Sequence, residues 1–186
     1  MNLKFSVFFD ITAVDDFFDS VIFSTASKKN CMQSYKSDKK PTLSEITNIM
    51  DCVRIIYKNN KSLIIYEDNL IDGGWTYINT IAKKFDIKTL YVRIKDEQPF
   101  PAYYLAYFEN NAERIIYNIK ENRWKFFKKG PVAFFEEDEK YLENKVADKF
   151  NKEKILLFCQ RLGIDVLNEQ FFVPVSPVYC MQRRKD

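Results

Sequence analysis

The chain has 186 residues, and 29 basic against 26 acidic side chains give it a net charge of +3. Hydrophobic residues make up 46% of the sequence and aromatic residues 16%, which excludes intrinsic disorder. A net charge this small does not indicate nucleic acid or a membrane surface as a partner. We therefore expect one globular domain over residues 1–186, in which residues 1–41 could form an N-terminal subdomain.

The sequence lacks the residues that the commonest catalytic and metal sites require. It contains no histidine, which excludes Ser-His-Asp and Cys-His arrangements and every histidine metal site. Its 4 glycines form no phosphate-binding loop, and no two of its 4 cysteines have zinc-knuckle spacing. We therefore expect no enzyme activity, no cofactor and no metal. The cysteines are expected to be buried free thiols, with a Cys31–Cys180 bridge as the alternative.

No segment is typical of membrane insertion or export. Apolar runs such as 155–158 are too short to span a bilayer. Asp10, Asp15 and Asp16 end the apolar start of the chain, and no small-residue cleavage site follows them. We therefore interpret this start as a strand and expect a cytoplasmic protein with no membrane partner.

Hydrophobic periodicity and turn residues predict the elements of the first half of the chain. Ile78, Ile81 and Phe85 recur at helical spacing, which predicts an amphipathic helix. The Asn-Asn-Lys sequence at 59–61 separates two β-branched runs, which predicts a hairpin. The predicted order is a strand at 3–11, a helix at 14–25, a basic polar loop at 26–41, a helix from 42 to about 50, strands at 52–58 and 62–67, and a helix at 75–85.

Closely spaced strands followed by helices are predicted in the second half. Asn151 as N-cap and Gly163 as C-cap bound the last predicted helix. The elements are strands at 88–95, 102–109, 112–120 and 123–128, then helices at 137–149 and 152–162. This order predicts an α+β fold: a single domain with a mostly antiparallel sheet and helices packed on one face.

An ordered series of residues between 112 and 164 resembles a known group of proteins. The series comprises Arg114, then Arg-Trp-Lys-Phe at 123–126, Gly130, Phe-Glu at 135–136, Tyr141, Asp-Lys-Phe at 148–150 and Leu-Gly-Ile at 162–164. Its order and spacing resemble those of small bacterial immunity proteins that protect against polymorphic toxins, including contact-dependent growth-inhibition toxins. Two positions depart from the pattern: Phe134 replaces an expected proline, and Lys149 replaces an expected arginine. The first fifty residues carry no part of the resemblance.

The resemblance implies a function without turnover. An immunity protein binds the C-terminal domain of a cognate toxin, for example a nuclease, in a one-to-one complex and occludes its active site or substrate surface. The resemblance implies no catalytic residues. An inhibitor of a nuclease can cover a basic substrate groove with carboxylates, which accelerate association and fix the register.

Acidic and aromatic side chains supply the candidates for partner contact. An acidic cluster begins at Glu136; it could contact a partner or simply form the solvated first turn of a helix. A loop that ends near Trp75 mixes aromatic and acidic residues; these could contact a partner, or they could cap the helix and pack in the core. The candidate partner-binding residues are Asp68, Asp72, Trp75, Glu136, Glu137, Asp138 and Glu139.

Two further functions stay open at this point. A hydrolase with a carboxylate-based or metal-assisted site would use residues such as Asp68, Asp72 or Glu136. A module that binds a small ligand would use a pocket on the tyrosine-rich sheet. Arg114 and Arg123, expected on neighbouring strands, would either pair with the acidic residues of 136–143 or bind an anion.

Overall fold

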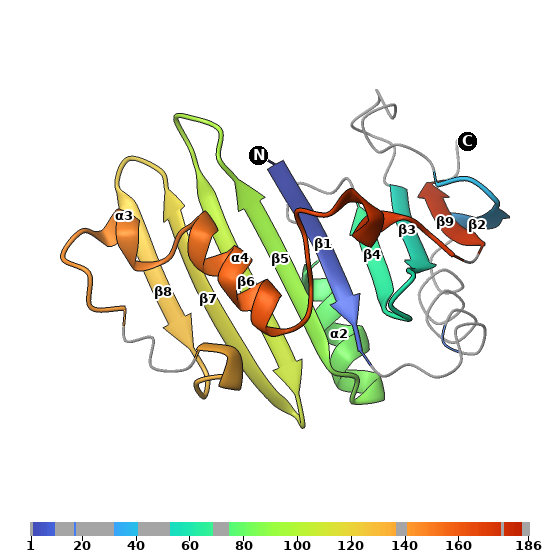
Figure 1. The fold of residues 1–186 in the computed structure, drawn as a ribbon, viewed down its shortest axis with the longest axis horizontal. Coiled ribbons are helices and arrows are strands. Elements are labelled where there is room, and N and C mark those ends of the chain that lie inside the picture. The colour runs from blue at the N-terminus through green and yellow to red at the C-terminus, as the bar shows by residue number, and fades with distance from the viewer. Residues whose placement is uncertain are drawn as a thin grey trace.

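The computed structural model describes residues 2–9, 17, 32–40, 53–68, 75–136, 141–175 and 177–183. These residues form one nine-stranded antiparallel sheet with helices on it, which confirms the predicted α+β class (Figure 1). The strands are β1 (Asn2–Phe8), β2 (Met32–Ser37), β3 (Val53–Lys58), β4 (Ile64–Asp68), β5 (Thr89–Lys95), β6 (Ala102–Glu109), β7 (Ala112–Lys120), β8 (Trp124–Lys129) and β9 (Val178–Arg183). The helices are α2 (Trp75–Phe85), α3 (Val146–Lys149) and α4 (Lys152–Arg161), with 3-10 turns η2 (Phe134–Glu136) and η3 (Glu169–Phe172).

The strand order mixes local hairpins with long-range pairings. The order is β2-β9-β3-β4-β1-β5-β6-β7-β8, so the first strand lies near the centre and β9 lies between β2 and β3. Strands β5 to β8 form a meander, as the spacing of their turns predicts. Asn110 and Asn111 make the tightest of these turns with φ of +51° and +60°, angles that asparagine tolerates well.

The two faces of the sheet carry different helices and separate cores. We define the front face as the side on which α3 and α4 lie and the back face as the side on which α2 lies (Figure 1). Successive residues of a strand alternate between the faces: Val7 belongs to the front core and Phe8 to the back core. The expectation that all helices pack on one face is therefore wrong, because both faces of the central strands are apolar and each requires a cover.

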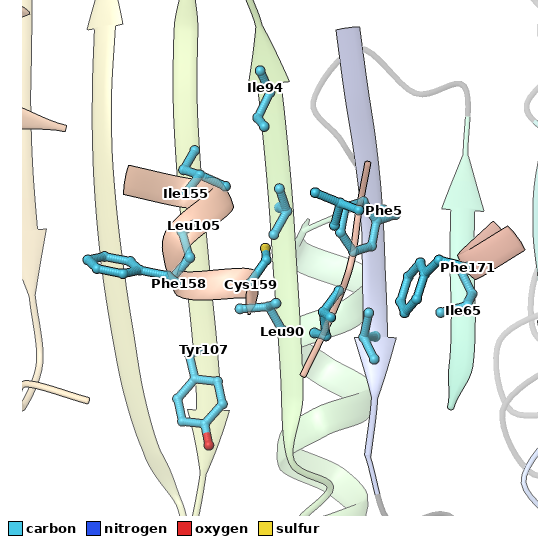
Figure 2. Close-up of a cluster of buried hydrophobic side chains, with 14 of the residues drawn as sticks. Phe5, Ile65, Leu90, Ile94, Leu105, Tyr107, Ile155, Phe158, Cys159 and Phe171 are labelled. Carbon is cyan, nitrogen blue, oxygen red and sulfur yellow. The ribbon is translucent and has the colours of Figure 1, made fainter. Parts of the chain in front are cut away.

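Among the described residues, the front core is the larger of the two. Phe158 and Cys159 of α4 pack on Leu90, Leu105 and neighbouring strand residues, as Figure 2 shows. Asn151 begins α4 as predicted, since its Oδ1 accepts a hydrogen bond from the Lys154 amide at 3.1 Å. This packing fixes α4, and through it the turn η2, against the meander.

The remaining predicted elements are confirmed only in part. The hairpin β3–β4 and helix α2 are confirmed, but β2 lies within the predicted loop 26–41, and β9 was not predicted. The predicted helices at 14–25 and 42–50 lie outside the described residues, apart from Phe17, whose ring lies 5.3 Å from that of Phe8.

The predicted helix 137–149 is confirmed only in its last turn, and it is wrong for residues 141–145. Residues 141–145 are not helical, and α3 is confined to its last turn. Tyr141 adopts φ of +54°, while its hydroxyl donates a hydrogen bond to buried Glu136 and its ring packs on Phe126. These tertiary contacts override a weak helical pattern.

Two further predictions concern the cysteines and membrane-spanning helices. Cys159 is a buried free thiol, and Cys180 is buried as well, while Cys31 lies outside the described residues. Burial raises the pKa of the Cys159 thiol to about 12, so it stays protonated at neutral pH. Within the described part of the chain, no helix has the length and apolar character needed to cross a membrane.

Candidate protein interface

A straight row of large side chains crosses the back face from one strand to the next. In its aromatic half, Tyr104 of β6 lies opposite Tyr117 of β7, which lies opposite Phe127 of β8. In its charged half, Tyr104 lies opposite Arg93 of β5, which lies opposite Lys4 of β1. The row therefore joins a basic segment to an aromatic one on the same face of the sheet.

The aromatic half continues onto helix α2. The ring of Trp75 lies 5.5 Å from Tyr91 and 6.4 Å from Tyr104, and Tyr91 lies 5.4 Å from Tyr104. The rings of Tyr104 and Tyr117 are stacked at 5.9 Å, and those of Tyr117 and Phe127 at 5.0 Å. We call these residues the aromatic ladder: Trp75, Tyr91, Tyr104, Tyr117 and Phe127.

The ladder becomes more exposed with distance from α2. Tyr91 is buried, Trp75, Tyr104 and Tyr117 are half-buried, and Phe127 is 40% exposed. Among the described helices, α2 is the one that covers this face, and it lies over β5 and β6. The ladder thus presents an aromatic surface beyond the edge of α2, of the kind that is enriched in binding hot spots.

Polar groups at the ends of the ladder side chains are available for contact. The hydroxyl groups of Tyr104 and Tyr117 form no hydrogen bond within the described part of the chain, and neither does the Trp75 indole N–H. Burial, the nearby charge of Glu113 and the adjacent Tyr117 raise the pKa of Tyr104 far above its usual value. Tyr104 therefore remains a neutral hydrogen-bond donor at physiological pH.

The charged half of the row ends in a buried ion pair. Lys4 Nζ lies 2.7 Å from Asp68 Oδ1, and the Tyr66 hydroxyl donates to Asp68 Oδ2 at 3.0 Å. A pocket of about 340 Å³ opens beside the pair, where β1, β4 and β5 meet at one end of the sheet. Its lining includes Lys4, Asp68, Arg93 and Lys95. The pocket combines three cations with two carboxylates, the second being Glu67.

A second polar cluster lies on the front face and is buried. Arg114 donates from Nε and Nη2 to the two carboxylate oxygens of Glu136, each at 2.7 Å, and from Nη1 to the carbonyl of Gly130 at 3.0 Å. The Tyr141 hydroxyl and the Ala133 amide also donate to Glu136. Burial alone would lower the pKa of Arg114, but its hydrogen bonds to Glu136 and the charge of Glu136 raise it.

This buried cluster contains several residues of the series that resembles immunity proteins. Arg114, Gly130, Glu136 and Tyr141 all belong to it, and their polar groups bond to one another. The predicted pairing of Arg114 with the acidic segment is confirmed. These contacts therefore fix the turn η2 and Tyr141 against β7.

The structure separates the residues that the sequence proposed for partner contact. Asp68 and Trp75 belong to the back face, close to the row. Glu136 lies on the opposite face and is 1% exposed, so its carboxylate is committed to Arg114 and is not presented to a partner. The other candidates, Asp72, Glu137, Asp138 and Glu139, lie outside the described residues.

The ladder residues other than Trp75 were not among the sequence candidates. The residues beside them give no clear polar and apolar alternation: Leu90 and Val92 flank Tyr91, whereas Ile116 and Asn118 flank Tyr117. The local sequence therefore indicates neither the face that these rings share nor which strands are adjacent. The registers of β5 to β8 are needed to bring the rings into one line.

The two described carboxylates proposed for a hydrolase, Asp68 and Glu136, do not meet. Asp68 lies on the back face with Lys4 and Tyr66, and Glu136 lies on the front face with Arg114 and Tyr141. A general acid and a general base must approach the same substrate bond, which these two residues cannot do. In the part of the chain that the structure describes, no cluster of acidic or cysteine side chains is arranged to hold a metal ion.

Comparison of the chain with protein-family models, with curated proteins and with solved structures found no match.

Proposed function

We propose that this protein is an immunity protein that binds the C-terminal domain of a cognate toxin one-to-one and neutralises it by occlusion. The observation that carries the proposal is the aromatic ladder, which offers the exposed ring of Phe127 and the unbonded donors of half-buried Trp75, Tyr104 and Tyr117 on one side of the sheet. Aromatic residues bury a large area with few rotatable bonds, so they bind a partner surface at low cost in entropy.

The buried Arg114 cluster supports the same proposal from the opposite side of the sheet. A family of inhibitors must keep one fold while its contact surface changes with each toxin. In this chain Arg114, Glu136 and Tyr141 of the recognisable series are engaged on the front face, away from the aromatic ladder. These three residues and the ladder thus have separate roles.

A stoichiometric titration tests this function. The toxin domain encoded by the adjacent gene is mixed with increasing amounts of the purified full chain, and residual toxin activity is measured. Occlusion predicts that inhibition is complete at one molar equivalent and that a one-to-one complex elutes from size exclusion. Inactivation by a small fraction of an equivalent would indicate an enzyme and contradict the proposal, as would the absence of a complex.

A matched pair of phenylalanine variants tests where the toxin domain binds. Phe127 on the back face is 40% exposed and Phe134 on the front side is 61% exposed, so both can be truncated with little effect on the core. We expect Phe127→Ala to weaken the complex roughly tenfold, because it removes the outer ring of the ladder. Phe134→Ala should leave the affinity unchanged in the same calorimetric measurement. The reverse ranking would place the interface on the front face.

A further inference from the structure

Among the described residues, the exposed charges beside the aromatic ladder are mostly positive. Lys125 and Lys129 project from β8 on the side of Phe127, because residues of a strand separated by two share a face. Lys83 lies on α2 over the same face, and Arg93 and Lys95 lie on the back of β5. The side chains of Lys83, Lys125 and Lys129 are 50%, 54% and 64% exposed.

Two of the described carboxylates on this face, Asp68 and Glu113, are largely covered by the protein itself. The Asp68 side chain is 1% exposed and pairs with Lys4, and the Glu113 side chain is 15% exposed and lies 3.9 Å from both Lys83 and Lys129. Among the described residues, Glu121, which pairs with Lys125, is exposed at the turn before β8, and Glu97 and Asp86 are exposed at the ends of β5 and α2. Directly beside the ladder, the described part of the chain therefore presents more accessible cations than anions.

Arg93 is the cation best placed to bind a specific group. It lies between Lys4 and Tyr104 in the row and lines the 340 Å³ pocket with Lys95. Neither Arg93 nor Lys95 forms an ion pair with any residue in the described ranges. An arginine in this situation can bind a carboxylate through two parallel hydrogen bonds, while its neighbouring cations strengthen the attraction.

The geometry of the rings favours a protein partner over a nucleic acid. Single-stranded nucleic acids bind aromatic side chains by stacking bases on open ring faces. The planes of Tyr104 and Tyr117 are inclined by 6° and those of Tyr117 and Phe127 by 19°, so the faces of these rings are turned toward one another. What remains for a partner is the ring edges and the tyrosine hydroxyls, which suit apolar side chains and oxygen acceptors.

We infer that the toxin domain contacts this face with an acidic surface, one of whose carboxylates occupies the pocket and binds Arg93. The inference rests on the proposed function and specifies the chemistry of its interface. It differs from the expectation that acidic residues of this protein cover a basic substrate groove. An inhibitor with a basic interface binds an acidic region of the toxin instead, and it blocks the substrate by its bulk.

Charge reversal at Arg93 tests the inference in the full chain. The affinity of the purified toxin domain encoded by the adjacent gene is measured by calorimetry for the wild type, for Arg93→Glu and for Lys145→Glu. Lys145 is exposed beside α3 on the front side and provides the same sign of charge change away from the row. We expect Arg93→Glu to weaken binding about a hundredfold and Lys145→Glu to have no effect beyond about twofold. Lys129→Glu, at a more exposed site, is expected to weaken binding about tenfold, so a fold defect in one variant does not decide the result.

The outcomes separate the inference from the function on which it rests. If the wild-type chain forms no complex, both the inference and the proposed function are overturned. If the wild type binds and Phe127→Ala weakens the complex while Arg93→Glu and Lys129→Glu do not, the acidic partner surface is wrong and the function stands. A labelled single-stranded oligothymidine that binds the wild type but not Arg93→Glu would overturn the inference in favour of a nucleic acid.

Discussion

Replacing Arg114 by alanine is expected to lower the free energy of unfolding by about 3–5 kcal/mol, which is a large share of the stability of a domain this size. The Arg114 side chain is 5% exposed and that of Glu136 is fully buried, so the substitution leaves a carboxylate without its cation in a low-dielectric core. It also removes the donor to the carbonyl of Gly130. Urea denaturation followed by circular dichroism measures the change.

Arg123→Ala is the control for this substitution. Arg123 is exposed in the turn between β7 and β8, and its removal is expected to change the free energy of unfolding by less than about 0.5 kcal/mol. Equal effects of the two variants would show that the buried pair has no special role in stability. Arg114→Ala could lower the free energy of unfolding while the protein that remains folded binds the toxin domain with unchanged affinity. This result would show that the buried front cluster is not part of the interface.

We expect the two faces of the sheet to have different roles, stability on the front and partner binding on the back. The front face holds the larger core, in which Phe135, Phe150 and Phe158 pack together beneath the turn η2 and helix α4. The back face is covered by α2 at its centre and carries the ladder beyond it. Mutations on the front are therefore expected to act through stability, and mutations of the outer ladder through affinity.

Local sequence signals predicted the meander and its neighbours well. Helix α2 and strands β5 to β8 follow clear apolar periods, and turn residues such as Asn110 and Asn111 have the backbone angles that hairpins require. The ends of α4 follow from capping chemistry at Asn151 and Gly163. Each of these signals acts between residues that are close in sequence, so no tertiary information is needed to interpret them.

Features that depend on distant pairings were not predictable in the same way. Strand β2 has a polar sequence and is held in the sheet by β9, more than a hundred residues later, so neither strand has a local signal that specifies it. The helical pattern before α3 failed because Tyr141 is fixed by contacts with Glu136 and Phe126.

The same distinction between local signals and distant pairings applies to the candidate site. Trp75 could be selected from the sequence by its residue type and its position at a helix start. The ladder and the charged half of the row, which contains Arg93, could not be selected from the sequence. They depend on the registers of six adjacent strands, β4, β1 and β5 to β8. Glu136 was selected for its charge, although burial and Arg114 give that charge a structural role.

Gly130→Ala is the second substitution for which we expect a large loss of stability. Gly130 has φ of +87°, which a residue with a side chain adopts at a cost of about 1–2 kcal/mol. A Cβ at this position would lie 1.9 Å from the backbone carbonyl oxygen of Glu113, so β8 or β7 would have to move. With the overlap included, we expect the free energy of unfolding to fall by about 2–5 kcal/mol.

Gly163→Ala separates the steric part of this effect from the conformational part. Gly163 has a similar φ of +75°, but a Cβ there would meet no atom within 4 Å, so we expect a loss of only about 1–2 kcal/mol. Urea denaturation of both variants under the same conditions gives the difference directly. A Gly130 variant that is no less stable than the Gly163 variant would contradict the close approach of β7 to residue 130, and with it the geometry that lets the Gly130 carbonyl accept a hydrogen bond from Arg114. The larger loss at Gly130 would instead identify this glycine as the position that allows the chain to turn tightly beside the buried ion pair.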